Sequence, residues 1–335
     1  MKLSENAIRP ARLDREKNLA IKVDIDWLTS RRQQFVAVSC PACGGSSFKH
    51  HFAKFGFDFD RCGDCRTVFM NPRAPAELLG EFYKRSAVYE FWNEYVFPAS
   101  RTARIEGIFK PRLARILELC QGNNVPRGML VEIGAAAGMF CEEALRTKTF
   151  ERVVGIEPNA VQAEKCRSLG IEVIEDPVER AAEFDRSADV VVCFETIEHV
   201  FDPGALIAWC GDLLSPGGLL ILTCPNSEGF DILTLATQSD SIDAEHINLF
   251  NPHSLKLLVE SMGLDVLECT TPGELDVEIV RNKVVAGEYS LENQAFLERV
   301  LLSEWGTLGH AFQEFLKANR LSSHMWLVAR NPDVS

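Results

Sequence analysis

The sequence contains no apolar run of the roughly 18 residues that a membrane-spanning helix requires. Residues 1–17 lack the apolar middle of a secretory signal peptide. Positive charge is also scarce, since 35 Lys and Arg residues face 48 Asp and Glu residues and leave a net charge of -13. This balance works against a broad phosphate-binding surface. We therefore expect a cytoplasmic protein that binds neither membranes nor nucleic acid.

Most of the cysteines stand alone within apolar segments. Seven of the eleven fit this description: Cys120, Cys141, Cys166, Cys193, Cys210, Cys224 and Cys269. Isolated cysteines in such segments behave as small buried hydrophobes, and a reducing cytoplasm disfavours disulfides. We predict no chemistry for these seven.

The other four cysteines form two matched pairs, Cys40-Pro-Ala-Cys43 and Cys62-Gly-Asp-Cys65, with 18 residues between them. This spacing is typical of a four-cysteine zinc site. Four thiolates complete a tetrahedron and leave no position for a substrate, so the predicted zinc is structural and stabilises a unit too small for a core of its own. A redox-active Cys-x-x-Cys is the competing interpretation, which two matched pairs make the weaker one.

One stretch, Met129 to Phe140, has the pattern of a strand, a tight turn and a helix start. The apolar run from Met129 ends in a carboxylate at Glu132, the chain turns at Gly134, and Gly138 opens an amphipathic helix. Glu132 falls at the carboxyl end of the strand, where open α/β sheets bind ligands. The spacing is Glu-x-Gly-x-x-x-Gly rather than Gly-x-Gly-x-x-Gly, which makes NAD the weaker reading. The alternative is an ordinary strand-to-helix turn that binds no ligand.

The chain from Leu119 to Met262 resembles the class I S-adenosylmethionine-dependent methyltransferases, whose first motif is an acidic residue followed by such a glycine turn. Here Ala136 replaces the middle glycine common in that motif. The resemblance implies an α/β fold with a Rossmann-like, seven-stranded, doubly wound sheet, a last strand near 325–330, and S-adenosyl-L-methionine as the cofactor. Such a cofactor would lie against Glu132, Gly134, Ala136 and Gly138.

The next strand ends supply further candidates for cofactor binding. Glu157, with Pro158 beside it, follows the turn by about 20 residues, a position suited to the two ribose hydroxyls. The resemblance places Asp176, or its neighbour Glu175, at the adenine amino group. It also places Phe194 and Glu195, at the end of the buried run DVVVCF, near the cofactor.

Two histidines are candidates for proton transfer. The segment FETIEHVFDP contains Glu195, Glu198 and His199. One interpretation is that these three residues hold a divalent metal, as in catechol-type quinone methyltransferases; the other is that His199 and Glu198 hydrogen-bond the neighbouring loop. His246, with Glu245 adjacent, lies in a segment that resembles the EHxNxF-type stretch of small-molecule methyltransferases. A histidine near neutral pKa suits a general base, so His246 is the first candidate, His199 the second and Glu245 its supporting carboxylate. A structural loop histidine is the alternative.

The cysteine spacing and the resemblance together divide the 335 residues into an N-terminal extension (1–37) without assigned chemistry, a zinc ribbon (38–74), a helical linker or lid (75–120) and a methyltransferase domain (121–335) with a helical insertion at about 274–322. It implies methyl transfer to a small polar substrate, such as a nucleotide-linked sugar or another polysaccharide or secondary-metabolite precursor. An RNA methyltransferase would show a basic stripe that this acidic chain lacks. A non-catalytic scaffold would have lost Glu132 and Glu157. The acceptor atom and the oligomeric state stay open.

Overall fold

A seven-stranded sheet lies at the centre of the computed structural model, which describes residues 3–175 and 187–332. The spatial order of its strands is β10, β11, β8, β7, β4, β5 and β6. The strands from β8 to β6 are parallel, while β11 runs antiparallel to both of its neighbours. Their bounds are β4 (Met129–Ile133), β5 (Arg152–Ile156), β6 (Glu172–Ile174), β7 (Ala188–Phe194), β8 (Leu214–Pro225), β10 (Asp265–Thr270) and β11 (His324–Arg330). The predicted Rossmann-like fold is confirmed.

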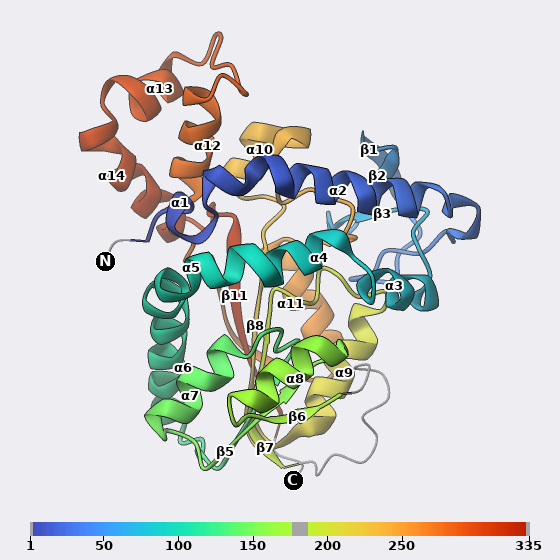
Figure 1. Cartoon of the computed structure of the whole chain (residues 1–335), viewed down its shortest axis with the longest axis vertical. Helices are drawn as coiled ribbons and strands as arrows, with labels where there is room; N and C mark the ends of the chain where they lie inside the picture. The colour runs from blue at the N-terminus through green and yellow to red at the C-terminus, as the bar shows by residue number, and fades with distance from the viewer. Residues whose placement is uncertain (1–2, 176–186, 333–335) are drawn as a thin grey trace.

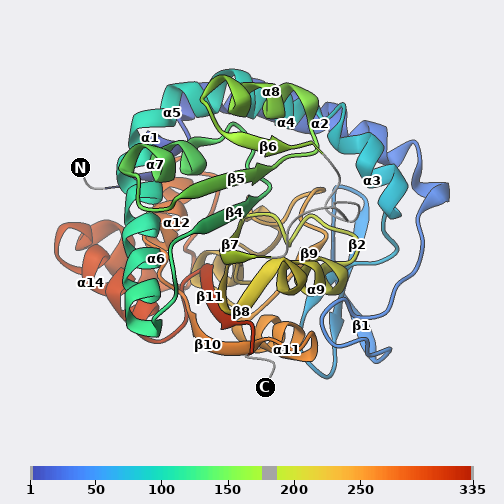
Figure 2. The ribbon, with the colours of Figure 1, turned by 90° about the horizontal axis from the view of Figure 1, so that it is seen from below.

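Helices cover both faces of this sheet, as Figure 2 shows. On one face, Val131 and its same-face neighbours pack with α9 (Pro203–Leu213) and α11 (Pro252–Ser261). On the other, Leu130 packs with α6 (Lys110–Asn123) and α7 (Met139–Thr147), beside α8 (Ala160–Ser168). Because both faces are buried, the inner strands are continuous apolar runs rather than alternating ones.

The four paired cysteines lie in or beside a second, smaller antiparallel sheet of order β1, β2, β3 and β9. Three of its strands are consecutive, namely β1 (Phe48–Lys54), β2 (Phe57–Cys62) and β3 (Val68–Met70). The fourth, β9 (Asn248–Leu249), comes from the loop after β8. Figure 1 shows β1 to β3 beside α2, away from the central strands.

A helical layer crosses the carboxyl ends of the parallel strands (Figure 1). It consists of α2 (Asp14–Thr29) and of α4 (Ala87–Phe91), which continues through η3 (Trp92–Val96) into α5 (Phe97–Arg104). Asp24 of α2 accepts hydrogen bonds of 2.9 Å from the backbone N–H groups of Ala87 and Val88, so the N-terminal extension caps α4. The remaining elements here are α1 (Glu5–Ile8), η1 (Ala11–Leu13), η2 (Arg32–Gln34), α3 (Ala76–Tyr83) and η4 (Ile105–Phe109).

The C-terminal helices pack around a separate apolar cluster that includes Val280, Leu301 and Leu316. They are α12 (Asp276–Val285), α13 (Ala295–Glu298), η6 (Arg299–Ser303) and α14 (Trp305–Ala318), joined by α10 (Phe230–Leu235) and η5 (Ala236–Gln238). The predicted helical segment is thus interrupted between α12 and α13. Within residues 3–175 and 187–332, no helix combines the length and apolarity needed to cross a membrane.

Candidate active site

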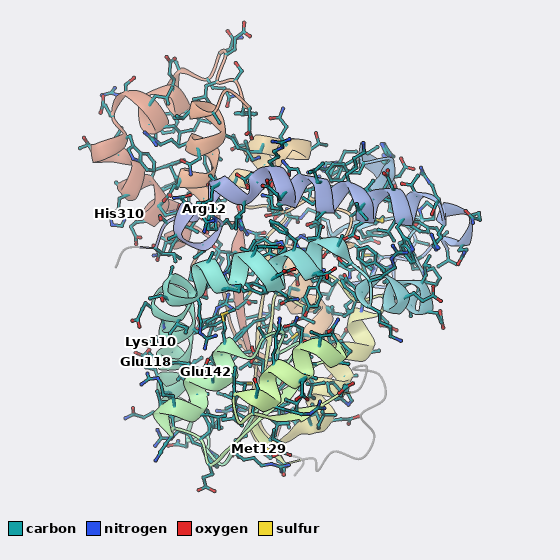
Figure 3. The ribbon with its side chains drawn as sticks, viewed as in Figure 1. Arg12, Lys110, Glu118, Met129, Glu142 and His310 are labelled. Atoms are coloured by element: carbon teal, nitrogen blue, oxygen red, sulfur yellow. The ribbon has the colours of Figure 1, made fainter. Side chains whose placement is uncertain are left out.

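A cavity of about 2100 Å³ lies where the carboxyl ends of β4, β5 and β7 meet α2 and α4. Figure 3 shows Met129, the first residue of β4, at the lower end of the molecule, so β4 runs from there up towards this cavity. A pocket for one small ligand typically measures about 300–1,000 Å³. The cavity therefore has room for a cofactor and a second molecule together.

The glycine turn after β4 forms one wall of the cavity. Gly134 and Gly138 have φ angles of +73° and +72°, in the left-handed region that favours glycine. A Cβ on Gly134 would lie 2.5 Å from Oγ1 of Thr196, so the turn has no space for a side chain there. Ala136 also has a positive φ, of 47°, and its backbone N–H donates a 2.8 Å hydrogen bond to Oε2 of Glu157.

Two buried carboxyl groups flank this turn. Glu132 is 4% exposed, and burial raises its pKa to about 8 while the thiol of Cys141 donates to its Oε2 over 3.0 Å. Glu157 receives the N–H of Ala136 on one oxygen and the N–H of Asn159, at 2.9 Å, on the other. Burial raises the pKa of Glu157, and these two N–H groups oppose that rise. The donor set and the glycine turn beside an open cavity fit an adenosine-containing cofactor.

Further residues predicted to bind the cofactor are Pro158, Phe194 and Asp176. Pro158 and Phe194 line the cavity. Asp176 lies outside the described residues. Its alternative, Glu175, lines the cavity and accepts a 2.9 Å hydrogen bond from Arg167.

Glu195 faces the cavity from the end of β7, with a φ of +49° and a side chain that is 42% exposed. Its Oε1 accepts hydrogen bonds from Arg112 (3.0 Å), His324 (2.8 Å) and Thr223 (2.6 Å). Partial removal from water inside the cavity would raise the pKa of Glu195, but His324, together with Arg112 and Thr223, holds it well below its usual range. The guanidinium of Arg112 also lies 4.5 Å from the ring of Phe194. Glu195 is therefore the centre of an ion-pair cluster at the cavity wall.

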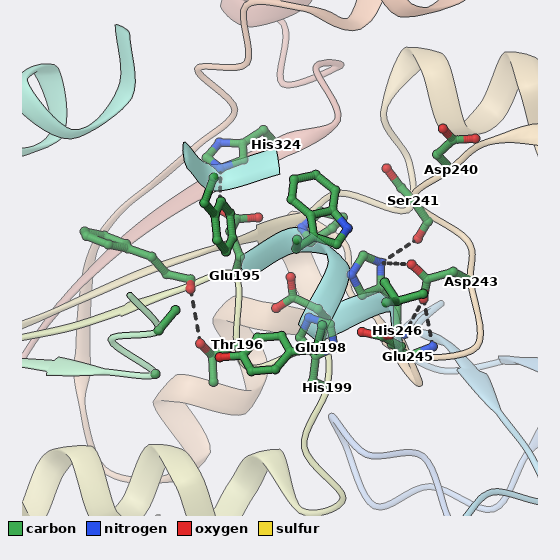
Figure 4. Close-up of a pocket in the computed structure, with 18 of the residues that line it drawn as sticks. Glu195, Thr196, Glu198, His199, Asp240, Ser241, Asp243, Glu245, His246 and His324 are labelled. Atoms are coloured by element: carbon green, nitrogen blue, oxygen red, sulfur yellow. Dashed lines mark hydrogen bonds and ion pairs between the residues drawn. The ribbon is translucent and has the colours of Figure 1, made fainter. Parts of the chain in front are cut away.

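The two candidate histidines lie side by side in the cavity (Figure 4), with ring centroids 4.7 Å apart. Nδ1 of His199 lies 3.0 Å from the hydroxyl of Tyr83, and burial, with His246 as the second cause, lowers the pKa of His199 to about 3. Nδ1 of His246 lies 2.8 Å from the carbonyl oxygen of Ser241. A carbonyl only accepts hydrogen bonds, so Nδ1 of His246 carries the proton and Nε2 keeps a free lone pair.

The prediction that Glu245 orients His246 is wrong. The carboxyl of Glu245 lies 3.5 Å from the hydroxyl of Ser86, and burial raises its pKa well above the ordinary value. The carboxylate beside His246 is Asp243, whose Oδ2 is 3.7 Å from Nδ1 and whose Oδ1 accepts the N–H of His246. Asp243 and Ser241 therefore fix the position of this ring.

Glu198 is buried, with 1% of its surface exposed. Within the described part of the chain neither of its carboxyl oxygens has a hydrogen-bond partner; Glu198 contacts the neighbouring loop through its backbone carbonyl, which accepts the N–H of Asn248 over 3.1 Å. Burial, reinforced by Glu195, raises its pKa well above the ordinary value. One ligand atom each of Glu198, His199 and His246 lies within 4.8 Å of the others. A carboxylate and two imidazoles are a donor set that divalent cations bind.

The four paired cysteines converge within 4.8 Å of one another. Sγ of Cys40 lies 3.4 Å from Sγ of Cys65, and Sγ of Cys43 lies 3.6 Å from Sγ of Cys62. A zinc tetrahedron with bonds of about 2.3 Å has sulfur–sulfur edges of about 3.8 Å. All four side chains therefore fit one zinc ion, which they would hold as a closed structural site.

Comparison with known proteins agrees with this geometry. Residues 105–269, which run from η4 to β10, match a family model described as a methyltransferase domain. Residues 105–269 are therefore a methyltransferase domain. The predicted family is confirmed, and the match covers the glycine turn, Glu157, Glu195 and both cavity histidines.

Curated relatives of this methyltransferase domain include two named ubiquinone biosynthesis O-methyltransferase. The one from Rhodopseudomonas palustris (strain BisA53) is 32% identical over 168 residues, 45% of this chain and 62% of that protein. The one from Salmonella arizonae is 33% identical over 142 residues, 39% of this chain and 58% of that protein. The chain thus spans about three fifths of the length of these relatives. A solved S-adenosylmethionine-dependent methyltransferase from Clostridium acetobutylicum has a TM-score of 0.48 at 10% identity, covering 72% of this chain and 99% of that one.

Several cavity residues of the methyltransferase were missed by sequence reasoning. Arg112 and His324 reach Glu195 from α6 and β11, and Tyr83 reaches His199 from α3. No local motif marks them, because their partners lie 83, 129 and 116 positions away. Asp243 carried a local signal, since aspartate commonly accepts hydrogen bonds from the backbone two or three residues further on.

Proposed function

We propose that the protein transfers the methyl group of S-adenosylmethionine to a hydroxyl oxygen of a small polar acceptor. The observation that carries this proposal is the 2100 Å³ cavity, which has the glycine turn and Glu157 on one side and the two histidines on the other. The relatives named O-methyltransferase support oxygen as the acceptor atom.

The cofactor would occupy the side of the cavity next to β4 and β5. Gly134 and Ala136 line the cavity, and Glu157 offers the remaining lone pairs of its carboxylate to a vicinal diol. Phe194 and Pro158 add apolar surface beside this position. The bound cofactor supplies an electrophilic methyl group, and the protein positions the acceptor and removes a proton.

His246 is the proton acceptor in this proposal. Its Nδ1–H donates to Ser241, which leaves Nε2 as a base. His199 is a poorer base because burial keeps its pKa at about 3. Asp243, 3.7 Å from Nδ1, would stabilise the imidazolium that forms.

A second arrangement is favoured by the unpartnered carboxyl of Glu198. If Glu198, His199 and His246 hold a divalent cation, that cation would lower the pKa of an acceptor hydroxyl, and His246 would be a ligand instead of a base. The same lone pair on Nε2 cannot serve both roles. Dialysis against a chelator, followed by restoration of zinc to the four cysteines, separates them, because activity that then returns only with Mg²⁺ or Mn²⁺ supports the ligand role.

The acceptor class is testable with labelled cofactor. Small molecules that co-purify with the protein are identified by mass spectrometry and then incubated with the protein and S-adenosylmethionine carrying a ¹³C methyl group. The proposal predicts one labelled methyl ether on a small hydroxylated molecule, of which a nucleotide-linked sugar is one candidate. Label in RNA, or on nitrogen or carbon alone, would contradict it.

A further inference from the structure

The small cysteine-bearing sheet is joined directly to the segment that carries His246. Strand β9 begins two residues after His246 and pairs with β3, with Asn248 opposite Phe69 and Leu249 opposite Val68. The N–H of Met70 also donates to the carbonyl of Ile247 over 3.0 Å. The backbone next to the proposed base is therefore part of the small sheet, not of the central one.

Asn248 extends this connection to the second histidine. It is fully buried, and its N–H donates to the carbonyl of Glu198 over 3.1 Å. Its Nδ2 donates to the carbonyls of Ile197 (3.3 Å) and Val200 (2.8 Å), which lie on either side of the Glu198-His199 pair. One asparagine thus connects β9 to the loop that carries Glu198 and His199.

Arg73 fixes that asparagine from the cysteine side. It follows β3 by three residues, is 3% exposed, and donates from Nη1 to Oδ1 of Asn248 over 2.7 Å. Its Nη2 donates to the carbonyl of Phe201 over 2.6 Å. A second connection starts at the cysteines themselves, since Nδ2 of Asn251 donates to the carbonyl of Cys65 over 3.0 Å.

The opposite side of the cavity has different supports. Glu157 is held by the N–H groups of Ala136 and Asn159, and the glycine turn by the carbonyl of Ile156, all within the central sheet and its loops. The cavity wall for the cofactor therefore rests on the central sheet and its loops, whereas the wall with the histidines is tied to the small sheet as well.

We propose that Arg73 and Asn248 are positioning residues through which the zinc-bound cysteine unit sets the places of His246 and His199. Zinc would then control the acceptor side of the active site without touching it. The catalytic roles of His246 and His199 rest on the proposed function, whereas the hydrogen-bonded connection between the cysteine unit and these histidines does not.

The test uses hydrogen exchange and cofactor-product binding on the zinc-loaded full chain, so no acceptor is needed. Two variants are compared with wild type: Cys62→Ser, which removes a metal ligand, and Asn248→Asp, which keeps the zinc and removes the Nδ2 donor. Asn123→Asp at the end of α6 is the matched control. We expect exchange in peptides covering 241–250 to become at least about tenfold faster in both variants and to change less than about twofold in peptides covering 129–135.

Binding of S-adenosylhomocysteine, measured by calorimetry, should stay within about threefold of wild type in Asn248→Asp, and the ¹H–¹³C signals of His246 and His199 should shift or broaden. Unchanged exchange at 241–250 after zinc loss, or unchanged histidine signals in Asn248→Asp, would overturn the proposal. If Cys62→Ser fails to fold, Asn248→Asp alone decides. Absence of S-adenosylhomocysteine binding to the wild-type protein would refute the proposed function instead. The hydrogen-exchange result would still decide whether the cysteine unit is connected to the histidine segment.

Discussion

The buried carboxyl of Glu132 predicts a distinctive pH dependence of stability. Burial raises its pKa from 4.5 to about 8, so this group is protonated in the folded protein and ionised in the unfolded chain between those two values. The folded state then binds one more proton than the unfolded state, and stability falls as the pH rises through this window. Each pH unit costs about 1.4 kcal/mol, or about 3 kcal/mol between pH 5.5 and 7.5.

The assay is urea unfolding of wild type and Glu132→Gln at several pH values from 5.5 to 7.5. Glutamine stays neutral and can still accept a hydrogen bond from Cys141, so the variant should lose this slope and gain stability over wild type by about 3 kcal/mol across the window. Other titrating groups are shared and cancel in the difference. Glu172→Gln is the control, because Arg152 lowers the pKa of Glu172 and its contribution changes only below pH 4.5. A difference between Glu132→Gln and wild type that does not change with pH would refute the reasoning.

Three further predictions concern the base, the metal and the turn. His246→Ala should lower turnover by about a hundredfold or more, the contribution of a general base, while the exposed His310→Ala leaves it unchanged; equal rates in both variants would exclude His246 as the base. Metal analysis of the isolated protein should give one zinc per chain, lost in Cys62→Ser, and a Cys40–Cys43 disulfide would contradict the zinc site. Gly134→Ala should destabilise the protein more than Gly170→Ala in urea unfolding. Both have a positive φ that costs alanine about 1–2 kcal/mol, but a Cβ at Gly134 also meets Thr196 while Gly170 has open space.

Features set by contiguous residues could be predicted from the sequence. The strand, turn and helix from Met129 onwards follow from the apolar run and from two glycines that both adopt positive φ. The cysteine pairs likewise indicated a single cluster, because each Cys-x-x-Cys pair turns its two thiols to one side and four of them suit one ion.

Features made by residues far apart in the chain could not be predicted. The extension contributes Asp24, which caps α4 across 63 positions, although residues 1–37 have no motif. Glu195 was expected at the cofactor, and its engagement by Arg112 and His324 depends on the order of strands in the sheet. The error over Glu245 is of another kind, since adjacent residues on an irregular loop need not face the same way and Asp243 has the better geometry.

Calorimetric titration with S-adenosylhomocysteine tests the central claim, a cofactor site against the turn after β4, most directly. The account predicts binding of one molecule per chain, weakened by about ten- to a hundredfold in Glu157→Ala through loss of hydrogen bonds to a charged group, worth about 1.5–3 kcal/mol. Glu142→Ala, on α7 outside the cavity lining, should bind as wild type does. Absence of binding of both S-adenosylhomocysteine and S-adenosylmethionine at millimolar concentration would contradict the account.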